Sequence, residues 1–315
     1  MKYRYAELVG ERRFEIKEGE ISCPPGKVLI RVEACGVCMW EVHGHYLGRV
    51  GRPPMVLGHE PAGVIVEVGE GVEGFKVGDR VTGLFTEGFA THAVSDPSLL
   101  VKIPEGMPFE HALFEPMKCV TTVAIATSPK AGDVVALVGC GFMGLLSWSV
   151  VKAPWLRTSI ALDIRPERLK LARELGFERV INPREEEPVE AVSRATQGRM
   201  ADIVLEATGS LKGLELASKI VKPRGKVVCI SSYLEPERVD LRAWGKSPIV
   251  VNAHPTYDVD PQDTFSRAAE LMRKGLFPMD RLVTHKFTLD EIGDAFETAL
   301  DPPPGYVKGV VLPNA

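Results

Sequence analysis

The chain has 315 residues, of which 45% are hydrophobic and 25% are charged, and its net charge is −4. This length and composition are typical of a globular protein of about two domains. With 38 basic residues against 42 acidic ones and no Lys/Arg run, nothing indicates a nucleic acid partner. Residues 1–20 lack the apolar core of a secretion signal, and six scattered cysteines fit a reducing cytoplasm better than a disulfide framework.

The first third of the chain is predicted to be rich in β-strands. Short β-branched or alternating runs are separated there by Gly, Pro and Asp, and they lie at residues 27–34, 63–69, 79–85, 89–94 and 99–104. Strands at this spacing, with few helices between them, predict a small barrel.

The segment CGVCMWEVHGHY, residues 35–46, follows the first of these strands and holds two cysteines and two histidines. Its CxxC pair has no second CxxC, which excludes a zinc ribbon. A thioredoxin-like redox pair is an alternative, although the βαβ context that it requires is missing here. Thiolate, imidazole and carboxylate groups suit Zn²⁺, so the candidates for a metal site are Cys35 or Cys38 together with His59, Glu60 and Glu115.

The pattern changes near residue 109. A helix is predicted over residues 109–128, and after it strands alternate with helices, the strands lying at 133–138, 158–163, 179–182, 201–207, 225–231 and 248–253. This alternation predicts a parallel sheet with helices on both faces. Residues 262–315 leave the alternation, with two predicted helices and a strand at 308–312, and we expect this segment to rejoin the first domain.

A glycine loop, GCGFMG, follows the strand at 133–138 and opens a helix. Gly139 permits the tight turn, Gly141 lets a pyrophosphate approach the backbone, and Gly144 lets helix and strand pack closely. A buried strand, turn and helix explain the uncharged run at 134–151 better than a membrane span does.

Asp163 lies at the end of the next predicted strand. A carboxylate there accepts hydrogen bonds from the adenosine ribose and repels the 2′-phosphate of NADP, so we expect NAD. Arg165 keeps NADP open as an alternative, and a structural glycine turn beside a surface Asp is the other interpretation.

With these residues in view, the sequence resembles the zinc-dependent alcohol dehydrogenase family, the medium-chain dehydrogenases/reductases, along nearly its whole length. The resemblance is carried by CGVC-x-x-E-x-H (35–43), GHEPAGVIVEVGEGVEGFKVGDRV (58–81), FEPM (114–117), GCGFMG (139–144), ADIVLEATG (201–209) and THKFTLDEIGDAFE (284–297). The Glu-Pro pair of the third motif is similar to that of sorbitol-type and other polyol dehydrogenases.

The resemblance implies an α/β fold in which a Rossmann domain with a doubly wound parallel sheet, residues 121–255, is inserted into a GroES-like β-barrel catalytic domain. The catalytic domain would comprise residues 1–120 and 256–315. One catalytic zinc per chain is implied, with Cys38 and His59 as ligands, Glu115 in the third-ligand place, and Glu60 as a ligand or a nearby second carboxylate. Cys35 is not expected to bind metal.

Further roles follow from the same resemblance. His43 matches the outer end of the proton relay, and Lys308 falls where the family often has a basic residue near the cofactor pyrophosphate. Phe142 and Met143 of the glycine loop, and Thr208, are expected to contact the cofactor together with the three glycines, Asp163 and Arg165.

The sequence departs from the family pattern in three places. No cysteine lies between Cys38 and Cys119, so the structural-zinc lobe is missing and we expect no structural zinc. Trp40 stands where the family usually has a Ser or Thr that passes the proton, and indole has no hydroxyl. We interpret Trp40 as a pocket wall, with simple packing or lost activity as alternatives. Glu41 replaces the usual Asp, and Lys118 lies close after the Glu-Pro pair.

The expected function is zinc-dependent hydride transfer between a secondary alcohol, a polyol or sugar derivative, and NAD. The alternatives are a zinc-free quinone or enone reductase of the same superfamily, or a non-catalytic NAD-binding protein. Residues 248–253 resemble the edge strand through which family members pair, so we expect a homodimer or homotetramer. From the scattered cysteines we expect a cytoplasmic protein, and we expect no membrane partner.

Overall fold

The computed structural model describes residues 1–233, 238–239, 241–253 and 258–315. It divides into two compact units, unit 1 with Met1–Met117 and Ala268–Ala315, and unit 2 with Lys118–Arg267. The two boundaries fall inside α2 (Phe114–Thr127) and α7 (Pro261–Arg273). The expected boundary between residues 255 and 256 lies outside the described residues.

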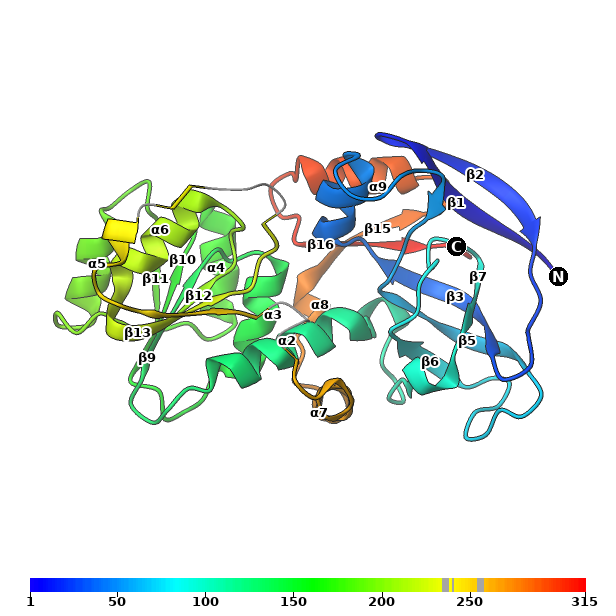
Figure 1. Ribbon diagram of the computed structural model, residues 1–315, viewed down its shortest axis with the longest axis horizontal. Helices are drawn as coiled ribbons and strands as arrows, with labels where there is room; N and C mark the ends of the chain where they lie inside the picture. The colour runs from blue at the N-terminus through cyan, green and yellow to red at the C-terminus, as the bar shows by residue number, and fades with distance from the viewer. Residues whose placement is uncertain (234–237, 240, 254–257) are drawn as a thin grey trace. The chain divides into compact units, whose positions relative to one another are not determined.

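Unit 1 is built around a seven-stranded sheet. Its order is β15-β16-β3-β5-β6-β8, with β7 also paired to β3, and all described pairs are antiparallel except β15 with β16. The strands are β3 (Val28–Gly36), β5 (Pro61–Val68), β6 (Arg80–Gly83), β7 (His92–Ser95), β8 (Leu100–Lys102), β15 (Val283–Thr288) and β16 (Lys308–Leu312). Figure 1 shows the C-terminal strand β16, in red, beside the blue strand β3. A strand from the end of the chain, β16, therefore completes a sheet whose first strand in sequence is β3.

The central strand β3 is buried along both faces except at Arg31 and Glu33, which explains its nearly continuous apolar sequence. Its side chains join one core with residues from β5, the loop at Phe89 and the C-terminal helix α9 (Ile292–Leu300). Short elements connect the strands, namely α1 (Met39–Glu41), the π-helix η1 (Val42–Tyr46), the 3₁₀ helices η2 (Pro97–Leu99) and η3 (Phe109–His111), and α8 (Met279–Leu282).

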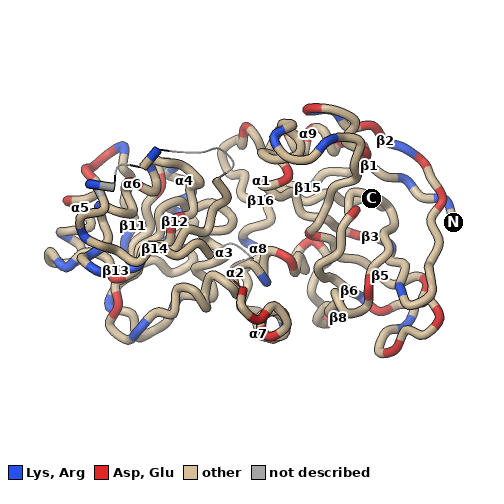
Figure 2. Tube along the Cα trace, viewed as in Figure 1, with Lys and Arg blue, Asp and Glu red and all other residues tan. Residues whose placement is uncertain are grey.

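An N-terminal hairpin forms a second, smaller sheet in unit 1. It consists of β1 (Lys2–Gly10) and β2 (Arg13–Glu20), and β1 also pairs with β4 (Met55–Val56). Sequence patterning did not predict it. Charges of both signs are interspersed along the two strands, as Figure 2 shows, and they conceal the apolar alternation. Lys17 of β2 pairs with Glu7 of β1 across the strands.

Unit 2 is a six-stranded sheet in which every described pair is parallel, in the order β11-β10-β9-β12-β13-β14. Its strands are β9 (Val134–Val138), β10 (Thr158–Leu162), β11 (Arg179–Ile181), β12 (Ala201–Glu206), β13 (Val221–Cys229) and β14 (Ile249–Asn252). Its helices are α3 (Phe142–Val151), α4 (Pro166–Glu174), α5 (Pro188–Ala195) and α6 (Leu211–Ile220), with the 3₁₀ helix η4 (Leu241–Trp244) before β14. In Figure 1 these helices surround the sheet, and β9 is buried throughout. The doubly wound parallel sheet expected from the sequence is confirmed.

Two local expectations need correction or closure. The helix expected from residue 109 begins only at Phe114, because the ring of Pro116 would clash with the carbonyl of Ala112 in a continuous helix. The uncharged run at 134–151 forms β9, the glycine turn and α3. Within the described residues, no helix is long and apolar enough to cross a bilayer.

Candidate functional site

Pairing of β3 with β5 builds the candidate metal centre in unit 1. Cys35 near the end of β3 is opposite Pro61 at the start of β5, and the Gly36 N–H donates to the Glu60 carbonyl, with a distance of 3.1 Å. The chain then leaves β3 through Cys38, the residue before α1. This register brings a segment from the first motif beside His59 and Glu60 of the second.

Three of the four predicted metal ligands come together. One ligand atom each from Cys38, His59 and Glu60 lies within 4.8 Å of the others, and this is the one such group of three in the part of the chain that the structure describes. Cys38 and His59 are half-buried and Glu60 is buried. A thiol, an imidazole and a carboxylate form a donor set that zinc uses in sites with an open fourth position.

Glu41 orients the imidazole of His59. Its Oε1 lies 2.8 Å from His59 Nδ1 and also accepts a hydrogen bond of 2.8 Å from the Gly58 N–H. Nε2 is thereby left for the side facing Cys38. The sequence marked Glu41 only as a replacement for Asp and gave it no role, yet its side chain is 3% exposed and holds a candidate ligand in place.

Glu60 forms a buried ion pair with Lys308 of β16. Lys308 Nζ donates to Glu60 Oε1 at 2.8 Å and lies 2.6 Å from Oε2, and the two residues are 4% and 1% exposed. Burial lowers the pKa of Lys308, but the charges of Glu60 and Cys38 outweigh this and raise it. Sequence reasoning placed Lys308 near the cofactor pyrophosphate, and that proximity stays a prediction.

The glycine of the CGVC motif, Gly36, makes room for this carboxylate. A Cβ on Gly36 would lie 2.0 Å from Glu60 Oε2 and 2.9 Å from Leu113 Cδ1. No side chain fits there without moving Glu60, so Gly36 is required by the packing of the centre.

The electrostatics of the group fit a bound cation. Burial raises the pKa of the Cys38 thiol, although His59 opposes this. Burial lowers the pKa of His59, but Glu41 and Cys38 outweigh it and raise that pKa to about 12. Oε2 of Glu41 is buried and accepts no hydrogen bond from the described residues, whereas Oε2 of Glu60 has only the ion pair with Lys308. These groups therefore favour a positive charge among them, which a zinc ion would supply.

Trp40 stands beside the candidate ligands. Its ring meets the ring of His45 edge-on with centroids 4.7 Å apart, and the ring of His59 with centroids 6.4 Å apart. His45 itself contacts the Val50 carbonyl through Nδ1, at 2.9 Å. Trp40 therefore packs between a structural histidine and a candidate ligand.

The remaining predicted residues of unit 1 lie outside the three-residue group. Cys35 is fully buried beneath Gly88, and burial raises the pKa of its thiol well above the usual value. His43 is half-buried, and burial followed by the charge of Arg49 lowers its pKa. Glu115 lies in the first turn of α2 and is half-buried, and the structure does not bring its carboxylate into the group.

The glycine loop of unit 2 has the geometry expected of a phosphate-binding turn. Gly139 has a φ of +95°, and a side chain on Gly144 would lie 2.3 Å from the Gly139 carbonyl oxygen. At Gly141, the residue before α3, nothing lies within 4 Å of the position of a Cβ. This open space at the amino end of a ten-residue helix, where Phe142 and Met143 begin α3, suits a pyrophosphate.

Asp163 fixes this loop. Its Oδ2 accepts a hydrogen bond of 2.7 Å from the Cys140 N–H, and its Oδ1 accepts one of 2.8 Å from the Arg165 N–H. Each carboxylate oxygen has a second lone pair that ribose hydroxyls could use. On the other side of the loop, the methyl group of Thr208 lies 2.8 Å from the position of a Cβ on Gly139. The predicted cofactor residues of unit 2 thus gather at one edge of the sheet.

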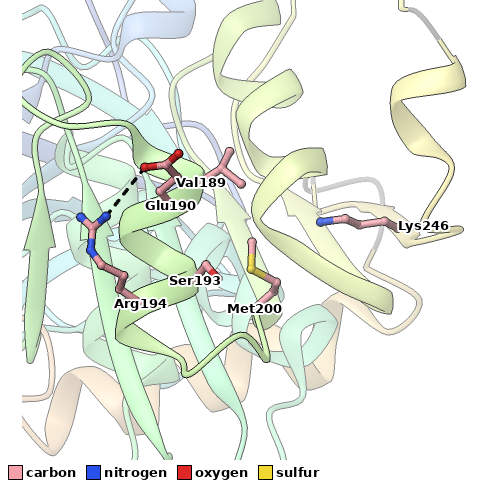
Figure 3. Close-up of a pocket in the computed structure, with 6 residues that line it drawn as sticks. All are labelled: Val189, Glu190, Ser193, Arg194, Met200 and Lys246. Atoms are coloured by element: carbon pink, nitrogen blue, oxygen red, sulfur yellow. Dashed lines mark ion pairs between the residues drawn. The ribbon is translucent and has the colours of Figure 1, made fainter.

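Unit 2 also has a cavity of about 560 Å³ near the amino ends of its strands, and Figure 3 shows the residues that line it. It is lined by Val189, Glu190, Ser193, Arg194, Met200 and Lys246. Arg194 lies 3.9 Å from Glu190, and Lys246 Nζ donates to the carbonyls of Lys219 and Val221. Met200 and Lys246 precede β12 and β14, so the cavity is at the amino ends of the strands. Ligands of doubly wound sheets bind at the carboxyl ends, so this cavity is not the candidate cofactor site.

Comparison with known proteins adds to this geometry. Residues 24–105 match the alcohol dehydrogenase GroES-like domain, and residues 143–274 match the zinc-binding dehydrogenase family. The chain is 31% identical to (R,R)-butanediol dehydrogenase of Bacillus subtilis over 330 aligned positions, which cover 92% of this chain and 93% of the relative. The chain belongs to the zinc-dependent alcohol dehydrogenase family.

Other members of the family show comparable similarity. L-threonine 3-dehydrogenase of Pyrococcus abyssi is 31% identical, with 90% of this chain and 91% of the relative covered. Sorbitol dehydrogenase of Bacillus subtilis is 28% identical, with 91% and 90% covered. The crystal structure of 2R,3R-butanediol dehydrogenase from Bacillus subtilis superposes with a TM-score of 0.86 at 29% identity, covering 99% of this chain and all of that one. This alcohol dehydrogenase is therefore an oxidoreductase with a GroES-like domain and a Rossmann domain.

Proposed function

We propose that this alcohol dehydrogenase oxidises secondary alcohols that carry a second polar group on the neighbouring carbon, with zinc in the centre of unit 1 and NAD in unit 2. The observation that carries the proposal is the grouping of Cys38, His59 and Glu60 with Glu41 behind the imidazole. The substrate class follows from the relatives, which are named for a diol, a polyol and a hydroxy amino acid.

Cys38, His59 and Glu60 are the proposed protein ligands, and the fourth position is left to the substrate oxygen or water. Glu60 is preferred to Glu115 because its carboxylate is already in the group. When bound, zinc acts as a Lewis acid toward the alcohol oxygen, and the nicotinamide ring accepts the hydride.

The side chains around the metal have separate tasks in this proposal. Glu41 fixes the tautomer of His59, and Lys308 keeps the charge of Glu60 compensated. Trp40 forms a wall that restricts the shape of the alcohol. Because indole cannot accept a proton, His43 is the proposed outer acceptor of the proton that leaves the substrate.

NAD is the proposed cofactor in preference to NADP. Asp163 sits beside the glycine loop and is tied to it through the Cys140 N–H. Its negative charge would repel a 2′-phosphate, whereas its carboxylate can accept hydrogen bonds from the free ribose hydroxyls of NAD.

A homodimer is proposed through β14. This strand is at the edge of the parallel sheet, and Ile249 and Val250 on it are 58% and 51% exposed. An exposed apolar edge strand pairs readily with a second copy. A cytoplasmic location is also proposed, since no disulfide joins any of the six cysteines, all of which the structure describes.

The test is a zinc measurement and a screen for NAD reduction on the same purified sample, using polyols, vicinal diols, β-hydroxy amino acids and simple alcohols. We expect about one zinc per chain and activity with the first three classes. Cys38→Ala should lose the zinc and the activity, whereas Cys35→Ala in the same motif should keep both. A zinc-free wild-type protein that reduces quinones or enones would overturn the proposal.

A further inference from the structure

Glu206 lies at the point in unit 2 where dinucleotides bind. It is the last residue of β12, and its register partner on β9 is Val138, the residue before Gly139. From β9 the chain builds β10 and β11 on one side and then β12, β13 and β14 on the other. The crevice at such a reversal of strand order is the ligand site of doubly wound sheets. Glu206 is therefore beside the glycine loop, and although it belongs to the motif ADIVLEATG (201–209), the motif assigned it no role.

The carboxylate of Glu206 is fully buried and accepts three hydrogen bonds. Its Oε1 accepts from the Thr208 N–H at 2.8 Å and from the Thr208 hydroxyl at 2.5 Å, and its Oε2 accepts from the Tyr233 hydroxyl at 2.5 Å. None of the described Lys or Arg side chains forms an ion pair with it. A buried carboxylate without a cation depends on its hydrogen bonds, so the three hydrogen bonds to Glu206 hold Thr208 and Tyr233 in place.

The packing around this carboxylate leaves little freedom. A Cβ on Gly213 would lie 2.6 Å from Glu206 Oε1 and 2.0 Å from Thr208 Oγ1. The Thr208 methyl group also closes the space beside Gly139. Two glycines are thus needed to accommodate the Glu206–Thr208 pair next to the loop.

Tyr233 is anchored at its hydroxyl but remains 37% exposed. It follows the carboxyl end of β13. Burial and the hydrogen bond to Glu206 raise its pKa, so the phenol stays protonated and keeps donating. An aromatic ring fixed at its polar end and open to solvent elsewhere offers a rigid flat surface at the crevice.

We propose that Tyr233 contacts the nicotinamide riboside half of the cofactor and that Glu206 is the residue that positions it. The inference rests on the proposed binding of NAD. Asp163 on the β10 side is placed to take the adenosine half, and the pyrophosphate crosses the loop after β9. The second nucleoside then lies over β12 and β13, where Tyr233, Thr208 and Glu206 meet.

The experiment measures dissociation constants for NAD and for ADP by calorimetry, since ADP has the adenosine and both phosphates but lacks the nicotinamide riboside. We expect Tyr233→Ala to weaken NAD binding about tenfold and Tyr233→Phe and Glu206→Gln about threefold to fivefold, with ADP binding changed less than twofold. The double variant Tyr233→Phe/Glu206→Gln should bind NAD no more weakly than the poorer single variant, because both substitutions remove the same hydrogen bond between Tyr233 and Glu206.

The outcomes separate the inference from the function beneath it. Equal losses for NAD and ADP would mean that Glu206 supports the loop or the fold, and unchanged NAD binding would mean that Tyr233 does not touch the cofactor. Either result overturns the inference. A wild-type protein that binds neither NAD nor ADP would instead overturn the proposed cofactor. Should Glu206→Gln fail to fold, the half-exposed Tyr233 variants still decide the question.

Discussion

Glu41 and His59 are joined by a hydrogen bond of 2.8 Å between Oε1 and Nδ1, and the same oxygen accepts the Gly58 N–H. One buried carboxylate oxygen therefore fixes both the imidazole and the backbone turn that presents it. Such partners behind metal ligands influence affinity nearly as much as the ligands themselves.

We expect Glu41→Gln to weaken zinc binding by about tenfold, because the imidazole then has a partner without charge. Glu41→Ala should weaken it by up to about 100-fold, because the imidazole then has no fixed partner. Competition with a chromophoric chelator measures this affinity. Glu105→Gln, an exposed glutamate, is the control and should not change it. Equal zinc affinity in Glu41→Ala and the wild type would contradict the assigned role.

Gly36→Ala should disturb the same centre from below. The new methyl group would lie 2.0 Å from Glu60 Oε2, so the carboxylate must leave the position in which it pairs with Lys308. We expect a loss of about 1–3 kcal/mol in the free energy of unfolding, measured in urea, together with weaker zinc binding. Gly10→Ala, where a Cβ meets nothing within 4 Å, should leave both values within error of the wild type.

Trp40 is expected to select substrates by shape. Trp40→Ser opens the space beside His59, whereas Trp40→Phe keeps a ring there. The ratio of kcat/KM for a bulky over a small secondary alcohol should rise about tenfold in Trp40→Ser and much less in Trp40→Phe. Identical ratios in the two variants and the wild type would show that Trp40 only packs.

The pH dependence of kcat tests His43. Burial, followed by the charge of Arg49, lowers its pKa below 6.5, so the ring is neutral at pH 7 and able to accept a proton. This form is lost as the pH falls through the lowered pKa, and kcat should fall with it on the acid side of pH 6.5. His43→Gln should remove that acid limb, whereas His285→Gln should retain it.

The same shift has a consequence for stability with a defined sign. His43 is harder to protonate in the folded chain than in the unfolded one, so lowering the pH below about 6.5 favours unfolding. Thermal melts between pH 5 and pH 7 should show a smaller loss on acidification in His43→Gln. An unchanged slope would mean that His43 titrates normally in the folded protein.

Ile249→Lys places a charge on the exposed edge strand β14. If this edge joins two copies, burying the ammonium there is costly and the dimer should dissociate at least tenfold more readily in sedimentation experiments. Val77→Lys, at another exposed apolar residue in unit 1, is the control. A dimer equally stable in both variants would place the interface elsewhere.

Sequence reasoning was most effective where a short motif contained the physics. The strand before GCGFMG and the helix after it follow from local composition. Cys38 belongs to one motif and His59 and Glu60 to another, and the pairing of β3 with β5 brings the two motifs together. The hairpin at residues 2–20 and the strand β15 were missed because charged and polar side chains interrupt their alternation.

The rest of the site depends on contacts that no local pattern specifies. Glu60 meets Lys308 across 248 residues, and Glu206 meets Tyr233 only because β12 and β13 are neighbours in the sheet. Glu115 shows the opposite case, since a motif suggested a ligand and the structure leaves its carboxylate outside the group. These points depend on distances between side chains, which residue types alone do not give, and the metal ligands stay a prediction.

The ion pair between Glu60 and Lys308 also determines when the centre can form during synthesis. The ribosome makes Lys308 248 residues after Glu60. Until β16 has been made, the Glu60 carboxylate in the N-terminal strands therefore lacks the counter-charge of Lys308. Burying that carboxylate early would be costly, so we expect the N-terminal strands to stay loosely packed until β16 docks. Removing residues 308–315 should therefore prevent closure of the metal centre, although every proposed zinc ligand would still be present.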